Sequence, residues 1–337
     1  MVRVGVVGLG MMGLTHLDVY RKRSDVKIVA ICDSDPKRLS GEAQAAGNVE
    51  GQAQSGVAEL QDVQRLTDIY QVIGNEEIDL VDICLPTDLH MRFGCDVLKA
   101  GQHLMIEKPL ARHAKDALQL VEAAKTSPGI VFVGHCMRYW PGWTWLRDAI
   151  QDGRYGKVLS AKFTRLASHP GGPFYTNGAR CGGAALDLHI HDTDFVQFCF
   201  GMPTAVTSFG YSNITDEPDH LITHYRYPDV PMVIAEGGWS MSAGYSFHMD
   251  FAVNFEQATA VYRMADSSPL TLFRPGEAPQ SIPVDPIMGY DLEIDDLIRC
   301  ITTKTKPTTV TVEDAYNTLR IIEAECESVR SGKTVAL

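Results

Sequence analysis

Short apolar runs alternate with helix-like stretches over the first 134 residues of the chain. The apolar runs are rich in β-branched residues, and we expect them to be strands at 2–7, 26–31, 79–85, 103–106 and 130–133. The helix-like stretches between them include 13–23, 89–99 and 115–125. Strands separated by helices predict a parallel sheet that is covered on both faces. Such a sheet binds its ligands beyond the carboxyl ends of the strands.

After residue 135 the alternation stops. Helix-like segments at 144–150 and 184–200 are followed by strand-like runs at 205–211, 223–227, 232–239, 247–255 and 260–264, and by a last helix near 312–329. Consecutive strands of this kind predict an open, mostly antiparallel sheet that helices cover on one face.

The expected fold class is therefore α/β, in two domains. Residues 1–134 are expected to form an N-terminal Rossmann-type domain, that is, a doubly wound parallel sheet. Residues 135–337 form a C-terminal α+β domain for substrate binding and oligomerisation, and the C-terminal helix is expected to pack back on the first domain. An apolar outer face on the second sheet predicts a homodimer or homotetramer, because large apolar faces are rarely left in water.

Three glycines follow the first strand directly, in the sequence Gly-Leu-Gly-Met-Met-Gly at 8–13. Gly8 permits a tight turn, Gly10 lets a pyrophosphate approach the backbone, and Gly13 allows the helix to pack closely on the strand. The pyrophosphate is then expected at the helix N-terminus, where free N–H groups favour an anion. This spacing alone is a weak signal, but here a strand precedes it and a helix follows.

An acidic residue stands at the required distance from this motif. Asp33 comes twenty residues after Gly13, at the carboxyl end of the second strand, where a carboxylate binds the ribose hydroxyls of NAD and repels the 2′-phosphate of NADP. Ser34 follows, where NADP enzymes often have a basic residue, although Lys37 and Arg38 lie within reach of a phosphate. NAD is therefore favoured over NADP. In the alternative Asp33 caps the next helix, but Asp35, before Pro36, is the better N-cap candidate.

Composition excludes several other classes of function. The net charge of −12 disfavours nucleic acid as a partner, since phosphate binding needs a basic surface. No window approaches the roughly 18 apolar residues of a membrane span, and no secretory signal is recognisable at the N-terminus. Eight scattered cysteines without a Cys-x-x-Cys pair indicate reduced thiols, so a cytoplasmic location is expected.

Two further motifs extend the pattern. The sequence Asp-Ile-Cys-Leu-Pro-Thr-Asp-Leu-His occupies 82–90, and Ala-Gly-Gln-His-Leu-Met-Ile-Glu-Lys-Pro-Leu occupies 100–110. Two shorter motifs are Glu-Lys-Pro at 107–109 and Gly182-Gly183 followed by Asp187 and His191. Together with the glycine motif, these motifs make the chain resemble the glucose–fructose oxidoreductase/inositol dehydrogenase (Gfo/Idh/MocA) family over its whole length. The sequence departs from that family at Thr87, where Asn is common, and at His189, where a small residue is usual.

The resemblance implies roles for particular residues. Lys108 would contact the nicotinamide ribose and the substrate hydroxyl, Asp187 and His191 would complete the catalytic group, and Pro109 would often be cis. The motif and the resemblance together predict these cofactor-binding residues: Gly8, Gly10, Met11, Met12, Gly13, Asp33, Arg38, Pro86, Thr87, His90, Glu107 and Lys108.

The residues at these positions are also chemically suited to such roles. An ammonium at the end of a strand can stabilise a developing alkoxide, and a histidine, whose pKa lies near neutrality, can take the alcohol proton. On a regular helix Asp187 and His191 are four residues apart and share a face. His189 would point away from His191 by about 200°, and residue 193 is threonine, where the metallohydrolase pattern needs an acid. No metal is therefore expected.

Substrate contacts are expected from two further segments and from the catalytic group. Arg138 and Trp140 follow the fifth strand, and a long loop at 168–180 carries His169, Tyr175 and Arg180. Arg138 can bind substrate oxygens, and an indole can stack on a sugar ring. Trp145, on the following helix, is expected in the core instead. The expected substrate-binding residues are Lys108, Arg138, Trp140, His169, Tyr175, Arg180, Asp187 and His191.

These residues favour NAD-dependent oxidation or reduction of a secondary alcohol on a sugar, sugar acid or cyclitol, as in inositol dehydrogenase. Two alternatives use the same residues. In the first, transient oxidation acidifies a C–H bond and permits glycoside cleavage by elimination, with the cofactor recycled internally. In the second, the chain is a non-catalytic sensor of dinucleotide or sugar, which the joint presence of Lys108, Asp187 and His191 disfavours.

Overall fold

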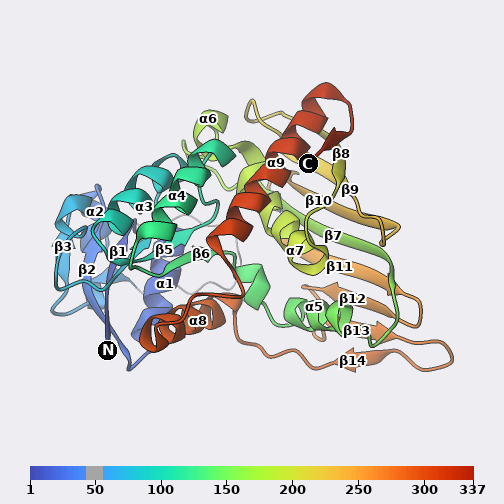
Figure 1. Ribbon diagram of the computed structural model, residues 1–337, viewed down its shortest axis with the longest axis horizontal. Coiled ribbons are helices and arrows are strands. Elements are labelled where there is room, and N and C mark those ends of the chain that lie inside the picture. The colour runs from blue at the N-terminus through green and yellow to red at the C-terminus, as the bar shows by residue number, and fades with distance from the viewer. Residues whose placement is uncertain (43–55) are drawn as a thin grey trace. The chain divides into compact units, whose positions relative to one another are not determined.

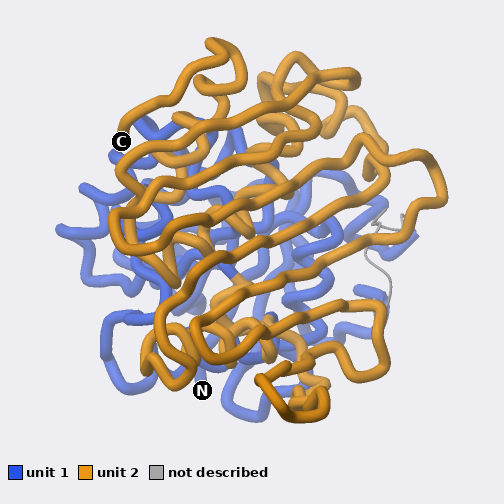
Figure 2. The backbone as a smooth tube through the Cα atoms, turned by 90° about the vertical axis from the view of Figure 1, so that its right-hand side faces the viewer, with its two compact units in different colours: residues 1–135, 290–316 blue, residues 136–289, 317–337 orange. Residues whose placement is uncertain are grey.

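The structure is a computed structural model that describes residues 1–42 and 56–337. These residues divide into two compact units, which Figure 2 shows in different colours. Unit 1 contains Met1–His135 and Tyr290–Tyr316, and unit 2 contains Cys136–Gly289 and Asn317–Leu337. The first break therefore lies one residue after the boundary expected from the sequence. The segment that rejoins unit 1 is 290–316, and most of the last helix belongs to unit 2 instead.

Unit 1 is built on a parallel sheet with the strand order β3-β2-β1-β4-β5-β6 among the described residues (Figure 1). The strands are β1 (Val2–Val7), β2 (Val26–Cys32), β3 (Gln64–Leu66), β4 (Leu80–Ile83), β5 (His103–Glu107) and β6 (Val131–Gly134). The predicted doubly wound sheet is thus confirmed. The short strand β3 had not been predicted, because two of its three residues are polar and exposed.

The helices of unit 1 are α1 (Met11–Arg21), α2 (Pro36–Ser40), α3 (His90–Lys99), α4 (Ala114–Thr126) and α8 (Gly289–Thr303), whose first residue is counted in unit 2. Short 3-10 turns lie at Val57–Glu59, Ile69–Gln71 and Thr87–Leu89. Strands β2 and β3 lie on one side of β1 in the sheet, and β4, β5 and β6 lie on the other side. Because the crossover connections are right-handed, α1 covers one face of the sheet, and α3 and α4 cover the other. Ligands bind an open α/β sheet at the point where the strand order reverses in this way.

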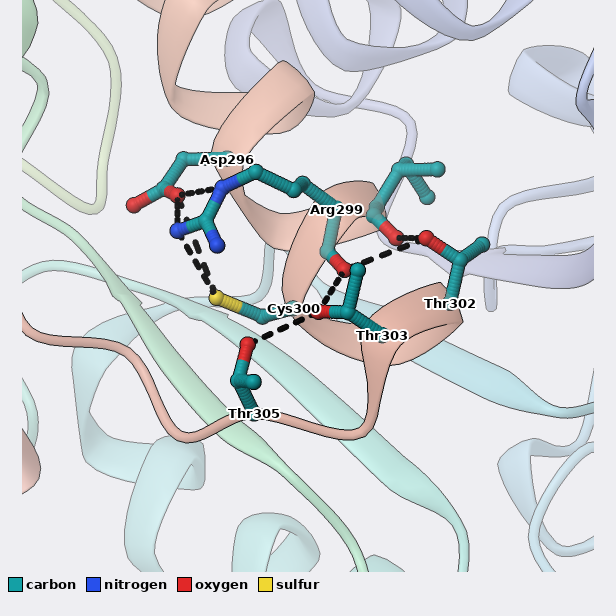
Figure 3. Close-up of polar contacts among 7 residues, drawn as sticks. Asp296, Arg299, Cys300, Thr302, Thr303 and Thr305 are labelled. Carbon is teal, nitrogen blue, oxygen red and sulfur yellow. Dashed lines mark hydrogen bonds and ion pairs between the residues drawn. The ribbon is translucent and has the colours of Figure 1, made fainter.

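Helix α8, which the sequence analysis did not predict, is attached to the end of α1. Lys22 lies 3.1 Å from Asp291, and Arg23 lies 2.7 Å from Asp295. Hydroxyl groups in its last turn bond back to the helix: Thr302 donates to the carbonyl oxygen of Ile298, and Thr303 to that of Arg299 (Figure 3). The left-handed backbone of Lys304 then ends the helix.

Unit 2 is built on a larger mixed sheet, with the order β14-β13-β12-β11-β7-β10-β9-β8-β15 in the described part of the chain. Its strands are β7 (Val158–Ser168), β8 (Ala205–Tyr211), β9 (His220–Arg226), β10 (Met232–Met241), β11 (His248–Phe255), β12 (Thr259–Arg263), β13 (Leu270–Phe273), β14 (Gln280–Ile282) and β15 (Val335–Ala336). The prediction of a mostly antiparallel sheet is confirmed, but β7 and β10 pair in parallel.

The central strand β7 was missed in the sequence. Its buried positions alternate with outward positions that carry polar residues such as Lys162, and one of the buried positions is Arg165. An arginine at a core position breaks the apolar alternation that identifies a strand. The structure resolves this conflict by pairing Arg165 with Asp192, whose side chain is also fully buried.

The helices of unit 2 are α5 (Trp143–Gln151), α6 (Gly178–Cys181), α7 (Ile190–Phe200) and most of α9 (Val312–Ser331). A π-helical turn at Ala185–His189 leads into α7, and a 3-10 turn lies at Cys136–Tyr139. The core contains Trp143, which contacts Phe163, Phe195 and Phe251. The expectation that Trp145 is the core tryptophan is therefore wrong: Trp145 is half-buried, because α5 directs its buried face through Trp143, Leu146 and Ala149.

The outward face of the unit 2 sheet carries exposed apolar side chains. Phe209 on β8 is 67% exposed, and its partner across the strand pair, Ile222 on β9, is 37% exposed. Tyr211 and Met232 are also exposed. We call these four residues the outer apolar patch.

In the residues that the structure describes, no helix has the length and apolar character needed to cross a membrane.

The two tryptophans of α5 provide a test of this core. Trp143→Ala removes a fully buried indole, and such a change costs about 3–5 kcal/mol of unfolding free energy. We expect a clear fall in the urea midpoint, followed by circular dichroism. Trp145→Ala, two residues away and half-buried, is the matched control and should cost much less. Equal losses in the two variants would contradict this description of the core.

Candidate functional site

The glycine motif forms a turn in which backbone packs directly on backbone. Gly8 has a φ of +93°, and a Cβ there would lie 2.4 Å from the carbonyl oxygen of Cys84. A Cβ on Gly13 would lie 1.9 Å from the carbonyl oxygen of Gly8. Neither position can accept a side chain without displacing backbone. These two glycines therefore bring the start of α1 close to the ends of β1 and β4.

Gly10 differs from its neighbours because a Cβ there would meet no described heavy atom within 4 Å. It is the N-cap residue of α1, in extended conformation, and no side chain caps the helix in the described structure. A side chain at position 10 would thus enter open space at the start of α1, beside the half-buried Met11 and Met12. A helix N-terminus of this kind suits a pyrophosphate.

Asp33 lies just beyond the end of β2, and its carboxylate is directed at the glycine turn. Its Oδ2 accepts the amide of Leu9 at 2.8 Å, and its Oδ1 accepts the amide of Asp35 at 2.9 Å. The exposed Arg38 lies 3.4 Å from Oδ2. Asp35 caps α2, since its side chain accepts the amide of Lys37, so the alternative role of Asp33 as the cap does not hold. The open turn and this carboxylate together fit NAD.

Two expected cofactor residues follow β4. Pro86 is half-buried, and Thr87 is buried at the start of a 3-10 turn. His90 was also expected to bind the cofactor, and this needs correction. Its buried ring places Nδ1 2.7 Å from the carbonyl oxygen of Pro109 and Nε2 2.7 Å from that of Leu85. Both nitrogens are used by the backbone, so His90 joins the segments after β4 and β5 instead.

The Glu-Lys-Pro motif ends β5. Lys108 is half-buried, and the Lys108–Pro109 peptide bond is cis, as the resemblance implied. Glu107 was expected to contact the cofactor, but its carboxylate is buried and directed inward. One oxygen accepts the amide of Lys108 at 3.1 Å, and the other lies 3.2 Å from Nε2 of His16. Glu107 therefore supports Lys108 from within the unit.

His16 belongs to a group of residues that the sequence analysis missed. Its partner Asp82 stands within the apolar strand β4, and Tyr20, four residues after His16 on α1, also bonds to Asp82. One signal was available: a carboxylate inside an apolar strand, together with polar residues at helical spacing on the helix after the glycine motif, requires a buried partner.

In unit 2 the candidate catalytic residues lie at the start of the long helical segment. Asp187 is within the π-helical turn and His191 is in the first turn of α7. Asp187, Leu188 and His191 are half-buried, whereas His189, Ile190 and Asp192 are buried. The two candidates are thus on the accessible side of the segment, although the segment is not the regular α-helix expected. π-turns of this kind are frequent at functional sites.

The inner side of α7 is held by buried polar contacts. Asp192 pairs with Arg165 at 2.7 Å, and Asp194 pairs with Arg138 through two bonds of 2.8 and 2.7 Å. Arg138 was expected to bind substrate. The structure corrects this, because its guanidinium is buried against Asp194 and stacks over Phe198. His189 is fully buried and lies 3.1 Å from Glu325 on α9, so it does not share the side of His191.

The remaining expected substrate residues are partly accessible. Trp140 is half-buried and directly follows the 3-10 turn that precedes α5. His169 and Tyr175 pack edge-on against the buried Trp239, and the Arg180 guanidinium lies over the Phe174 ring. The loop at 168–180, from which substrate contacts were expected, therefore packs on aromatic side chains, and His169, Tyr175 and Arg180 are half-buried.

Two family models match the chain. Residues 2–135 match the "Oxidoreductase family, NAD-binding Rossmann fold", and residues 143–261 match the "GFO/IDH/MocA C-terminal domain". The chain belongs to the GFO/IDH/MocA oxidoreductase family. The resemblance seen in the motifs is confirmed, and so is the NAD-binding character of the first domain.

Curated relatives and solved structures agree with this assignment. The myo-inositol 2-dehydrogenase of Thermotoga maritima is 28% identical over 59% of this chain and 55% of its own length. The D-apiose dehydrogenase of Paraburkholderia graminis is 26% identical over 98% of this chain and 88% of its own length. A levoglucosan dehydrogenase in complex with NADH superposes with a TM-score of 0.86, at 19% identity, over 99% of this chain and 98% of that chain. With several curated relatives, the match spans little more than half of their length.

The position of Asp33 leads to a prediction about cofactor choice. We expect NAD to bind at least about tenfold more tightly than NADP, because the carboxylate repels a 2′-phosphate. Asp33→Ala should narrow the difference, and Asp33→Asn should do so while keeping an acceptor for the amide of Leu9. Asp35→Ala, which removes only the cap of α2, is the control. Calorimetric titration that gives equal affinities for the unmodified protein would contradict the prediction.

Proposed function

We propose that the chain is an NAD-dependent dehydrogenase that oxidises or reduces a secondary alcohol on a sugar, sugar acid or cyclitol. The observation that carries the proposal is the arrangement in unit 1. The glycine turn, the Asp33 carboxylate and Lys108 all follow carboxyl ends of strands in one parallel sheet, where such a sheet binds its ligand. The dehydrogenase names of the relatives support the substrate class.

The residues divide the chemistry between them. The bound NAD supplies a hydride acceptor. The turn at Gly8–Gly13 and Asp33 bind and orient the dinucleotide, and Lys108 stabilises the developing negative charge on the substrate oxygen. We assign His191 as the base that takes the hydroxyl proton, and Asp187 as the group that orients His191 or binds a second hydroxyl. Tyr175, His169, Arg180 and Trp140 are the proposed substrate contacts of unit 2.

The amount of NADH formed per substrate molecule consumed distinguishes the possible reaction types. A panel of polyols, sugar acids and cyclitols should include a compound that produces NADH in proportion to product. Substrate consumption without net NADH would instead support cleavage through transient oxidation, with the cofactor recycled. Binding of NAD without any turnover on the panel would support a sensor.

Lys108 and His191 should act on the chemical step and not on cofactor affinity. A group that binds the developing alkoxide more strongly than the alcohol lowers the barrier without tightening the ground state. Loss of a general acid or base typically costs about 10²–10⁴-fold in rate. We expect Lys108→Ala and His191→Ala to lose activity on that scale while the Kd for NAD changes less than about tenfold. Near-normal turnover of His191→Ala, with chemistry rate-limiting, would show that the base is misassigned.

We also propose that the protein is a homodimer or homotetramer assembled through the unit 2 sheet. The outer apolar patch supports this, because Phe209 and Ile222 lie opposite each other on neighbouring strands. Light scattering should report an oligomer at micromolar concentration. Phe209→Glu should shift the protein toward monomer, whereas Leu118→Glu, which charges an exposed leucine of α4 in unit 1, should not. A monomeric unmodified protein would refute the proposal.

A cytoplasmic location belongs to the same proposal. The eight cysteines form no disulfide in the described residues, and five of them are buried. Fractionation of the source cells would test it.

A further inference from the structure

A buried ionic network connects three elements of unit 1. His16 on α1 places Nδ1 2.9 Å from Oδ2 of Asp82 on β4, and Nε2 3.2 Å from Oε1 of Glu107 on β5. The His16 and Asp82 side chains are fully buried, and Glu107 is nearly so. Tyr20 donates its hydroxyl to the same Asp82 oxygen at 2.9 Å. One imidazole thus lies between two carboxylates that come from neighbouring parallel strands.

The imidazole is suited to this place only as a cation. A neutral ring carries one proton and no charge, whereas an imidazolium carries a proton on each nitrogen and attracts both carboxylates. Here Nδ1 is hydrogen-bonded to Asp82, and Nε2 forms an ion pair with Glu107. Burial is the largest single influence and by itself lowers the pKa of His16, but Asp82 and Cys84 together outweigh it and hold the pKa well above its usual 6.5. Without the cation, two carboxylates would share a dry site at high cost.

The thiol of Cys84 completes the surroundings of Asp82. Its Sγ lies 3.4 Å from Oδ1 of Asp82 and 3.5 Å from Nδ1 of His16. Burial raises the pKa of this thiol far above its usual value, so it remains protonated and serves as a neutral donor. Cys84, Asp82 and His16 thus form one compact buried group, with their polar atoms within 4.8 Å of one another.

Glu107 transmits this arrangement to Lys108. Its Oε2 accepts the backbone amide of Lys108 at 3.1 Å, while Oε1 faces His16. Gly134 at the end of β6 leaves room for the carboxylate, since a Cβ there would lie 2.9 Å from Oε1. The carboxylate is thus confined by α1, by β6 and by the amide that it accepts. Helix α1 is the same helix whose N-terminus forms the open turn at Gly10.

We propose that His16 is a positioning residue: its imidazolium holds the Glu107 carboxylate, and Glu107 in turn holds the backbone of Lys108 relative to the dinucleotide turn. This inference rests on the proposed role of Lys108 in the reaction. His16 touches neither substrate nor cofactor in this arrangement. It keeps the reactive ammonium in register with the helix that binds the pyrophosphate, and misplacement by about 1 Å can cost 10²-fold in rate.

The first test is independent of activity. The Lys108 amide should be protected from hydrogen exchange in the unmodified protein, because it donates to the Glu107 carboxylate. Its exchange can be resolved, because the next residue, Pro109, has no amide hydrogen. In His16→Gln we expect exchange at Lys108 to accelerate by about tenfold or more, because Glu107 loses its cation and moves. Tyr20→Phe removes a bond to Asp82 but none to Glu107, and should leave this rate within about threefold. Equal protection of Lys108 in His16→Gln and the unmodified protein would overturn the proposal.

A second measurement needs no variant. With ¹⁵N-labelled histidine, both ring nitrogens of His16 should carry protons at about pH 8, where an ordinary histidine is neutral. A neutral His16 ring at that pH would overturn the proposal even if His16→Gln failed to fold.

Kinetics separates positioning from general stabilisation. We expect His16→Gln to lower kcat by roughly 10–100-fold, with KM and the Kd for NAD within about threefold. If His16 acts through Glu107, the double variant His16→Gln/Glu107→Gln should be no slower than the slower single variant. The proposal would be overturned if the fold-loss in kcat of the double variant equalled the product of the two single losses. It would also be overturned if Tyr20→Phe were as slow as His16→Gln. An unmodified protein that is inactive on every substrate would defeat the proposed function, while the exchange and labelling results would still decide the network.

Discussion

Buried charges that find partners on other elements hold the candidate functional segments of both units. In unit 1 the His16 imidazolium lies between Asp82 and Glu107, and in unit 2 Arg165 and Arg138 pair with Asp192 and Asp194. A charge removed from water is tolerated only with a partner of good geometry. Each pair therefore restricts where its helix can lie. The positions of the accessible residues next to the pair are restricted as a consequence.

This constraint explains why several residues expected to contact ligands have structural roles. Arg138, His90 and Glu107 have the chemistry for binding a sugar or a dinucleotide. Each of them instead has a buried partner. Arg138 pairs with a carboxylate, and His90 contacts two carbonyl oxygens. Glu107 accepts an amide and pairs with the imidazolium of His16. The residues that remain accessible, such as Lys108, Asp187 and His191, are one or a few positions away from these supports.

The two units differ in how helices cover their sheets. The parallel sheet of unit 1 is covered by helices on both faces, and the glycines at 8 and 13 let α1 approach it with backbone against backbone. The sheet of unit 2 has helices over one face, packed around Trp143, and the other face carries the outer apolar patch. The first unit thus brings the carboxyl ends of its strands to one edge of the sheet, and the second leaves apolar side chains exposed on one face.

The sequence by itself determined the features that depend on local spacing. These include the alternation of strands and helices to residue 134, the glycine turn with Asp33 after β2, and the cap at Asp35. They follow from backbone geometry over a few residues, so a single chain displays them. Only the tertiary structure decided which charges pair, because His16 and Asp82 are 66 residues apart and Arg138 and Asp194 are 56 apart. It also decided the place of Arg165 in the core strand β7, since a buried arginine is interpretable only when its carboxylate partner is known.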